Sequence, residues 1–356
     1  MPLVQHSDLP TFSRLREHGH EVLSLDRALH QDIRELHVGF LNMMPDAALE
    51  ATERQFIRLV GGCNRIAQFF VYPFSLPGLP RSAETLEYID RYYSSFEDLQ
   101  ASGLDALIIT GANVENPDLE QEPFWQPLME VISWAQNNVA STLCSCLATH
   151  AVLKKFHGID RQPIAEKHWG VFSHRVYAPG HPLLREINSS FDVQQSRYND
   201  ISRQKLEQAG LGVLVESDEG GVHMAVSPDQ FRLSYFQGHP EYDTNSLLKE
   251  YRREIVRYLN GELHRAPSFP RHYFSAGAAE IAERFVRDSE AALREDRLLP
   301  DYLEPEIAPE LDNTWGDTAK AIVANWLGLV YQVTNLDRRK QYMEGVDPDN
   351  PLDATE

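Results

Sequence analysis

Short apolar runs alternate with amphipathic stretches along the first 158 residues. Runs rich in β-branched and aromatic residues are typical of buried strands, whereas apolar positions that recur every three or four residues are typical of helices. Strands are predicted at 36–41, 67–72 and 104–110 and from residue 139, and helices at 46–60, 88–99 and 124–138. This alternation predicts an α/β protein with a doubly wound, mostly parallel sheet, whose active site lies at the carboxyl ends of the strands.

The pattern changes after this first part of the chain. Further strands, antiparallel in part, are predicted at 191–193, 211–216, 222–226 and 233–237, before a helix at 245–259. A charged amphipathic helix, an acidic linker and an apolar-rich helix follow at 275–299, 301–312 and 314–331. We therefore predict an N-terminal leader at 1–34 with a helix-like segment at 11–29, an α/β domain at 35–265 and a helical extension at 266–356.

The segment Val139–His150 predicts a strand that runs directly into a helix, with Cys146 at the corner. A side chain on such a turn is pushed out of the sheet, and the helix N-terminus beneath it stabilises a thiolate. Small neighbours permit the sharp turn, and Gly158 is a good helix end. Cys146 is therefore a candidate nucleophile, although a buried structural cysteine is the competing interpretation.

A candidate partner for this cysteine follows the strand predicted at 233–237. His239 comes directly after Gly238, Pro240 prevents further ladder pairing, and Glu241 lies two residues beyond His239. A histidine at a strand end can reach a cysteine on a neighbouring parallel strand, while a carboxylate fixes its tautomer. The residues predict a Cys146–His239–Glu241 triad, with a loop histidine of no catalytic role as the alternative for His239.

Composition narrows the class of partner. The formal net charge is −20, which argues against nucleic acid because binding to phosphates needs clustered Lys and Arg. The three cysteines form no disulfide framework and no zinc spacing, and they fit a reducing cytoplasm. No run of eighteen apolar residues occurs. We expect a cytoplasmic enzyme that needs neither a metal nor a membrane.

Several motifs resemble the homoserine O-succinyltransferase family, the acyl-CoA-dependent enzymes that open methionine synthesis. The similarity covers roughly residues 35–265, and a weaker similarity is found at 325–334. The motifs are LNMMP at 41–45, TERQFIRL at 52–59, ITGA at 109–112, STLCSC at 141–146, EKHWGVFSH at 166–174, SRY at 196–198 and GHPEYD at 238–243.

The resemblance implies a class I glutamine-amidotransferase-like fold and ping-pong acyl transfer to L-homoserine. It implies Cys146 as the acyl-accepting nucleophile, His239 as the general base and Glu241 as the residue that orients it. Matching positions imply substrate contacts at Lys167, Ser196 and Arg253, with Arg253 as partner of the amino-acid carboxylate. It implies no bound cofactor, only acetyl-CoA or succinyl-CoA as co-substrate, and leaves open whether the protein is a monomer or a homodimer.

Acyl transfer also requires stabilisation of an oxyanion. The thiolate of Cys146 attacks the thioester, and His239 then deprotonates the homoserine hydroxyl for attack on the acyl-enzyme. The backbone N–H of Leu147 and one from the loop Gly111–Ala112 are the predicted donors.

The chain departs from the family pattern at several positions near the predicted site. Leu147 and His150 stand where the family has tryptophan and glutamine, and Asp46 and Ala47 replace a lysine pair. Gln194 and Gln195 replace the proline and histidine that precede SRY.

The acyl donor depends on Glu115 in GANVEN. Family members that transfer succinyl groups commonly have glycine here, and members that transfer acetyl groups commonly have glutamate. A glutamate would fill the space of a succinyl tail and repel its carboxylate, so acetyl-CoA is the expected donor. Alternatively, Glu115 points to solvent and selects nothing.

Two other classes of function remain open. A cysteine amidotransferase or hydrolase uses the same elbow and the same His-Pro-Glu sequence, but the glycines usual two residues on either side of its nucleophile are Cys144 and Ala148 here. A non-catalytic ligand-binding relative would not need all three triad residues.

Overall fold

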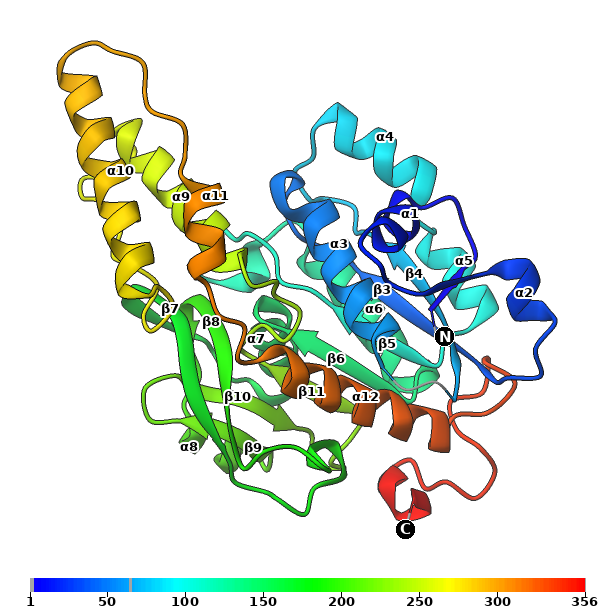
Figure 1. Ribbon diagram of the computed structural model, residues 1–356. Helices are drawn as coiled ribbons and strands as arrows, with labels where there is room; N and C mark the ends of the chain where they lie inside the picture. Colours follow the sequence, from blue (N-terminus) through cyan, green and yellow to red (C-terminus); the bar gives the residue numbers. More distant parts are fainter. Residues whose placement is uncertain (1–2, 64–65, 356) are drawn as a thin grey trace.

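A computed structural model describes residues 3–63 and 66–355 of the chain (Figure 1). Its strands form one eleven-stranded sheet. In spatial order the strands are β2 (Val22–Ser24), β1 (Leu3–Gln5), β4 (Gln68–Phe74), β3 (Glu35–Leu41), β5 (Ala106–Ile109), β6 (Ser141–Ser145), β11 (Leu233–Phe236), β10 (Gly221–Val226), β9 (Gly212–Ser217), β7 (Gln162–Val176) and β8 (Ser190–Asp200).

The sheet has a parallel and an antiparallel half. All neighbours from β2 to β11 pair in parallel, and the pairs from β11 to β8 are antiparallel. The predicted doubly wound, mostly parallel fold is therefore confirmed. β6 lies between β5 and β11, with Ser145 opposite Phe236, so the ends of β6 and β11 lie side by side.

Helices cover both faces of the sheet because each has one apolar face to bury. One hydrophobic cluster contains side chains of α1 (Pro10–Glu17), α3 (Asp46–Gly61) and α12 (Gly316–Val333). A second cluster contains α5 (Phe96–Ser102), α6 (Trp125–Asn138), α7 (Leu147–His157) and α8 (Arg203–Gln208). The remaining helices of this part are α2 (Leu25–Leu29), α4 (Ala83–Tyr92) and the 3-10 turns Leu119–Gln121 and Pro182–Leu184.

The C-terminal part projects from one end of the sheet and then returns (Figure 1). The projection consists of α9 (Ser246–Leu259), α10 (Ala276–Arg294) and α11 (Glu304–Ile307), whose apolar side chains share a third cluster. A 3-10 turn, Ala308–Glu310, leads toward α12, where Trp326 Nε1 donates to Ser141 Oγ at 2.8 Å. A last 3-10 turn spans Pro351–Thr355. Residues of the predicted extension thus contact the central strand β6, and the division into three parts stays a prediction.

Four predicted elements differ from the structure. The linker predicted at 301–312 contains α11 and the 3-10 turn Ala308–Glu310. The helix-like segment at 11–29 is wrong, because β2 separates α1 from α2. The helix at 88–99 is two helices, and Ser95 begins the second by accepting a hydrogen bond from Asp98 N at 3.0 Å. The short strand at 191–193 is the middle of the eleven-residue β8.

Candidate active site

The turn between β6 and α7 has the backbone geometry of a nucleophile elbow. Cys146 has φ 52° and ψ −110°, a conformation that costs energy for any residue with a Cβ. Two hydrogen bonds hold the turn: Cys146 N donates to Phe236 O at 2.7 Å, and Thr149 Oγ1 donates to Cys144 O at 2.8 Å. α7 ends at Gly158 in the left-handed conformation, as predicted. The half-buried Cys146 thus stands at the N-terminus of a helix beside the end of β11.

His239 and Glu241 lie next to this turn. The backbone N–H of His239 donates to Gln194 O at 2.9 Å, and His239 Nδ1 lies 2.8 Å from Glu241 Oε1. Both side chains are buried. Burial alone lowers the pKa of His239, but the negative charge of Glu241 and the interaction with Cys146 raise it well above its ordinary value. The structure therefore brings the three predicted triad residues together and favours an imidazolium at His239.

The loop after β5 approaches the elbow closely. A Cβ added at Gly111 would lie 3.6 Å from Cys146 Cβ and 3.7 Å from Leu147 N. The loop is held by Thr110, whose Oγ1 accepts from Met43 N at 2.8 Å and donates to Gly111 O at 2.9 Å. The backbone groups predicted to bind the oxyanion thus lie around the same small space beside Cys146.

The predicted substrate contacts converge on Glu250 of α9, a residue that the sequence analysis missed. Glu250 Oε2 accepts from Lys167 Nζ at 2.7 Å and from Ser196 Oγ at 2.6 Å. Burial would raise the pKa of Glu250, but Lys167, Ser196 and Tyr242 lower it to about 2. Glu250 is therefore an ionised, buried carboxylate between β7, β8 and α9.

Arg253 lies on the surface of the same helix. Its side chain is 54% exposed and lies 4.0 Å from Glu250 Oε2 and 3.7 Å from Glu254 Oε1. The sequence could have indicated Glu250, because residues three positions apart share one face of a helix. Glu250 precedes Arg253 by three residues.

Tyr242 connects the triad to this cluster and was also missed. Its ring stacks on the His239 ring, and its hydroxyl donates to Glu250 Oε1 at 2.7 Å. The sequence GHPEYD shows an aromatic residue after Glu241, but its contact with Glu250 depends on the position of α9.

Glu115 lies in a fixed loop with its side chain exposed. The backbone N–H groups of Glu115 and Asn116 donate to Glu122 Oε1 at 2.8 and 2.7 Å. On the other side of the loop, Arg161 Nη2 donates to Asn116 O at 2.8 Å and to Pro117 O at 3.2 Å. The backbone of this loop is therefore anchored on two sides, while the Glu115 carboxylate faces solvent.

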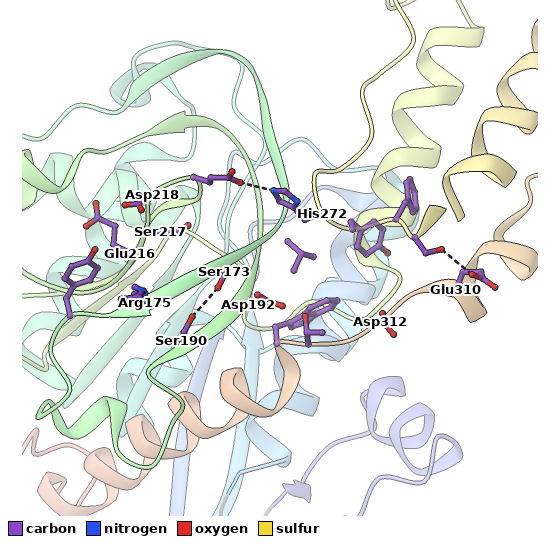
Figure 2. Close-up of a pocket in the computed structure, with 18 residues that line it drawn as sticks. Ser173, Arg175, Ser190, Asp192, Glu216, Ser217, Asp218, His272, Glu310 and Asp312 are labelled. Carbon is purple, nitrogen blue, oxygen red and sulfur yellow. Dashed lines mark hydrogen bonds and ion pairs between the residues drawn. The ribbon is translucent and has the colours of Figure 1, made fainter. Parts of the chain in front are cut away.

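A cavity of about 620 Å³ lies apart from the triad (Figure 2). It opens between the β7–β8–β9 strands and the segments 272–275 and 310–315, and its lining is rich in acidic side chains. Neither Cys146 nor His239 lines this cavity. Within residues 3–63 and 66–355, no group of three or more His, Cys, Asp or Glu side chains could hold a metal ion, and no helix is long and apolar enough to cross a membrane.

Comparison with known proteins gives consistent matches over nearly the whole chain. A family model described as homoserine O-succinyltransferase matches residues 2–336. A protein named homoserine O-succinyltransferase from Methylococcus capsulatus is 58% identical over 352 residues, which is 99% of each chain. Proteins of the same name from Nitrosococcus oceani and Thiothrix nivea are 57% and 58% identical over 99% of this chain and 98% of their own.

Solved structures of low sequence identity were also found. A glutamine amidotransferase from Methylobacillus flagellatus is 13% identical, with a TM-score of 0.45, over 83% of this chain and 95% of its own. One from Thermotoga maritima is 14% identical, with a TM-score of 0.40, over 85% of this chain and 99% of its own.

Proposed function

This chain belongs to the homoserine O-succinyltransferase family, and we propose that it transfers the succinyl group of succinyl-CoA to the hydroxyl of L-homoserine in methionine biosynthesis. The observation that carries the proposal is Cys146 on a strained helix N-terminus beside the buried His239–Glu241 pair. A thiolate in that position is the nucleophile that acyl transfer from a thioester needs.

The first half-reaction acylates the enzyme. The Cys146 thiolate attacks the thioester carbonyl, and the N–H groups of Leu147 and the Gly111–Ala112 loop hold the oxyanion. The intermediate collapses, the bond to CoA breaks, and the imidazolium of His239 gives its proton to the leaving thiolate. Glu241 keeps the imidazole oriented through Nδ1.

The second half-reaction uses the now neutral His239 as a base. It removes the proton of the homoserine hydroxyl, the alkoxide attacks the acyl-enzyme, and Cys146 leaves as a thiolate. Glu250 is a suitable partner for the substrate ammonium group, and Arg253 and Lys167 for its carboxylate, because each carries the opposite charge. Their convergence beside Tyr242 supports an acceptor site next to the base.

Two observations favour succinyl-CoA over the acetyl-CoA expected from Glu115. The relatives of 57–58% identity carry the succinyl name, and the Glu115 side chain is exposed. Acetyl-CoA stays the second candidate, because glutamate stands at position 115.

The test is release of free CoA from each donor, with and without L-homoserine. We expect homoserine-dependent CoA release with a higher kcat/KM for succinyl-CoA, and no release of ammonia from glutamine. A wild type that prefers acetyl-CoA and shifts toward succinyl-CoA in Glu115→Gly would instead support the acetyl assignment. Ammonia release without acyl transfer would support the amidotransferase alternative.

A further inference from the structure

Several buried side-chain nitrogen atoms, His239 Nε2 among them, have no hydrogen-bond partner among the described residues, and three of the others belong to residues that interact electrostatically around His150. These three are Nδ1 of His150, Nε of Arg161 and Nε of Arg197. His150 and Arg197 are only 3% and 6% exposed. A buried polar group without a partner is costly, so native proteins pair it with protein, water or a ligand. Because a guanidinium can only donate, the missing partner of the two arginines is an acceptor.

Two kinds of observation place these atoms in one region beside Cys146. His150 follows Cys146 by one turn of α7, which puts both on the same side of the helix. Burial, together with the charges of Arg161 and Arg197, lowers the pKa of His150 to about 3, so it is neutral. Burial also lowers the pKa of Arg197, while Asp200 and Cys146 act in the opposite direction. A negative charge on Cys146 thus acts on Arg197.

This region is separate from the proposed acceptor site. Side chains at neighbouring positions of a strand point to opposite faces, so Ser196 and Arg197 of β8 face different ways. Ser196 contacts Glu250, whereas Arg197 donates to Gln195 Oε1 at 2.7 Å, Gly220 O at 2.8 Å and Asp200 Oδ1 at 3.2 Å.

Each of the two arginines has carboxylates nearby. Asp200 is the direct partner of Arg197. Arg161 donates to the carbonyls of the Glu115 loop, and Glu122 and Asp118 act on it at longer range. Glu122 is already engaged by two backbone N–H groups of that loop.

We propose that His150, Arg161 and Arg197 form an anion subsite that receives the distal carboxylate of a succinyl group on Cys146. The proposal rests on the proposed function, because a free carboxylate on the acyl group is what distinguishes succinyl from acetyl.

The subsite is tested in the first half-reaction alone. Acylation of Cys146 is followed by intact-protein mass with succinyl-CoA, with butyryl-CoA, whose acyl chain has four carbons and no carboxylate, and with acetyl-CoA. Arg161→Gln and His150→Leu are compared with Arg161→Lys, which keeps the charge. Lys154→Gln is the control, because Lys154 is a cation on the helix that carries His150 and pairs with Asp118 and Asp160.

We expect Arg161→Gln to slow succinylation about 10- to 100-fold, the range for a lost charge-assisted hydrogen bond, and to slow butyrylation far less. Arg161→Lys should recover part of the succinyl rate, and Lys154→Gln should match the wild type. Equal slowing with all three donors would assign Arg161 a structural role and overturn the subsite. Unchanged selectivity for succinyl-CoA in Arg161→Gln and His150→Leu would overturn the subsite. If the wild type still acylated homoserine normally, the proposed function would stay intact. A wild type that no donor acylates would refute the proposed function itself.

Discussion

Tyr242 stacks on His239 with ring centroids 4.1 Å apart and an interplanar angle of 17°. Its hydroxyl donates to Glu250 at 2.7 Å, and Glu250 in turn accepts from Lys167 and Ser196. One side chain therefore joins the proposed general base to the proposed acceptor site. Tyr242 thus contacts both the proposed base and the buried carboxylate of Glu250.

The hydroxyl and the ring of Tyr242 can be tested separately. Tyr242→Phe keeps the stack but removes a hydrogen bond to a carboxylate, so we expect the KM for homoserine to rise about tenfold while acylation by succinyl-CoA continues. Tyr242→Leu removes the stack as well and should slow both half-reactions. Steady-state kinetics and single-turnover acylation measure the two effects. An unchanged KM in Tyr242→Phe would exclude Glu250 from homoserine binding.

The charge of Glu241 determines the protonation of His239. Because Glu241 and Cys146 raise the pKa of His239, its imidazolium persists as the pH rises past the ordinary value of 6.5. Glu241→Gln removes the negative charge, so the pKa of His239 should fall and less imidazolium should remain at pH 7 to stabilise the thiolate. We expect iodoacetamide to alkylate Cys146 more slowly in Glu241→Gln than in wild type at pH 7. The rate of alkylation is measured for both proteins between pH 5 and 9. Identical profiles for wild type and variant would contradict this electrostatic role.

Glu250 should make the fold sensitive to acid. A carboxyl whose pKa falls from 4.5 to about 2 on folding contributes stability that is complete above 4.5 and is lost as the pH falls through 2. The shift corresponds to roughly 3 kcal/mol. We expect urea unfolding of Glu250→Gln to depend less on pH between 5 and 2 than that of wild type. Glu280→Gln, which changes an exposed carboxylate on α10, is the control and should follow the wild type.

Gly111 belongs to the proposed oxyanion hole, and its lack of a side chain leaves space beside Cys146. An alanine Cβ there would meet only ordinary contacts, at 3.6 Å from Cys146 Cβ and 3.7 Å from Leu147 N, so the fold should tolerate it. The methyl group would enter the space proposed for the oxyanion, and we expect kcat to fall by about 10²- to 10³-fold with little change in Tm. Gly328→Ala on α12, where the added Cβ meets nothing within 4 Å, should leave kcat unchanged. Normal kcat in Gly111→Ala would place the oxyanion elsewhere.

Local chemistry explains what the sequence could predict. The elbow could be predicted because its parts depend on residues that are close in the sequence. These parts are the strand β6, the corner at Cys146 and the left-handed helix end at Gly158. The break between α4 and α5 is also local, because Ser95 caps the start of α5. The prediction of one helix at 88–99 followed the apolar pattern and did not use this cap. Glu250 was missed for a different reason: its partners lie on β7 and β8, 83 and 54 residues earlier, and only the folded sheet brings them together.

The assignment of Glu115 shows the limit of reasoning from residue type at one position. The expected contact with the acyl group had one alternative, a side chain that points to solvent. The structure shows the side chain exposed on a loop that is anchored through its backbone groups. The preference for acetyl-CoA stays a prediction until both donors are compared.

The most direct test of the account is the site of acylation. The protein is incubated with succinyl-CoA alone, quenched in acid and mapped by peptide mass. We predict one succinyl group on Cys146, none in Cys146→Ala, and wild-type labelling in Cys144→Ala, because Cys144 is fully buried and burial raises the pKa of its thiol. A succinyl group on Cys144, or turnover of homoserine without a covalent acyl-enzyme, would contradict the mechanism.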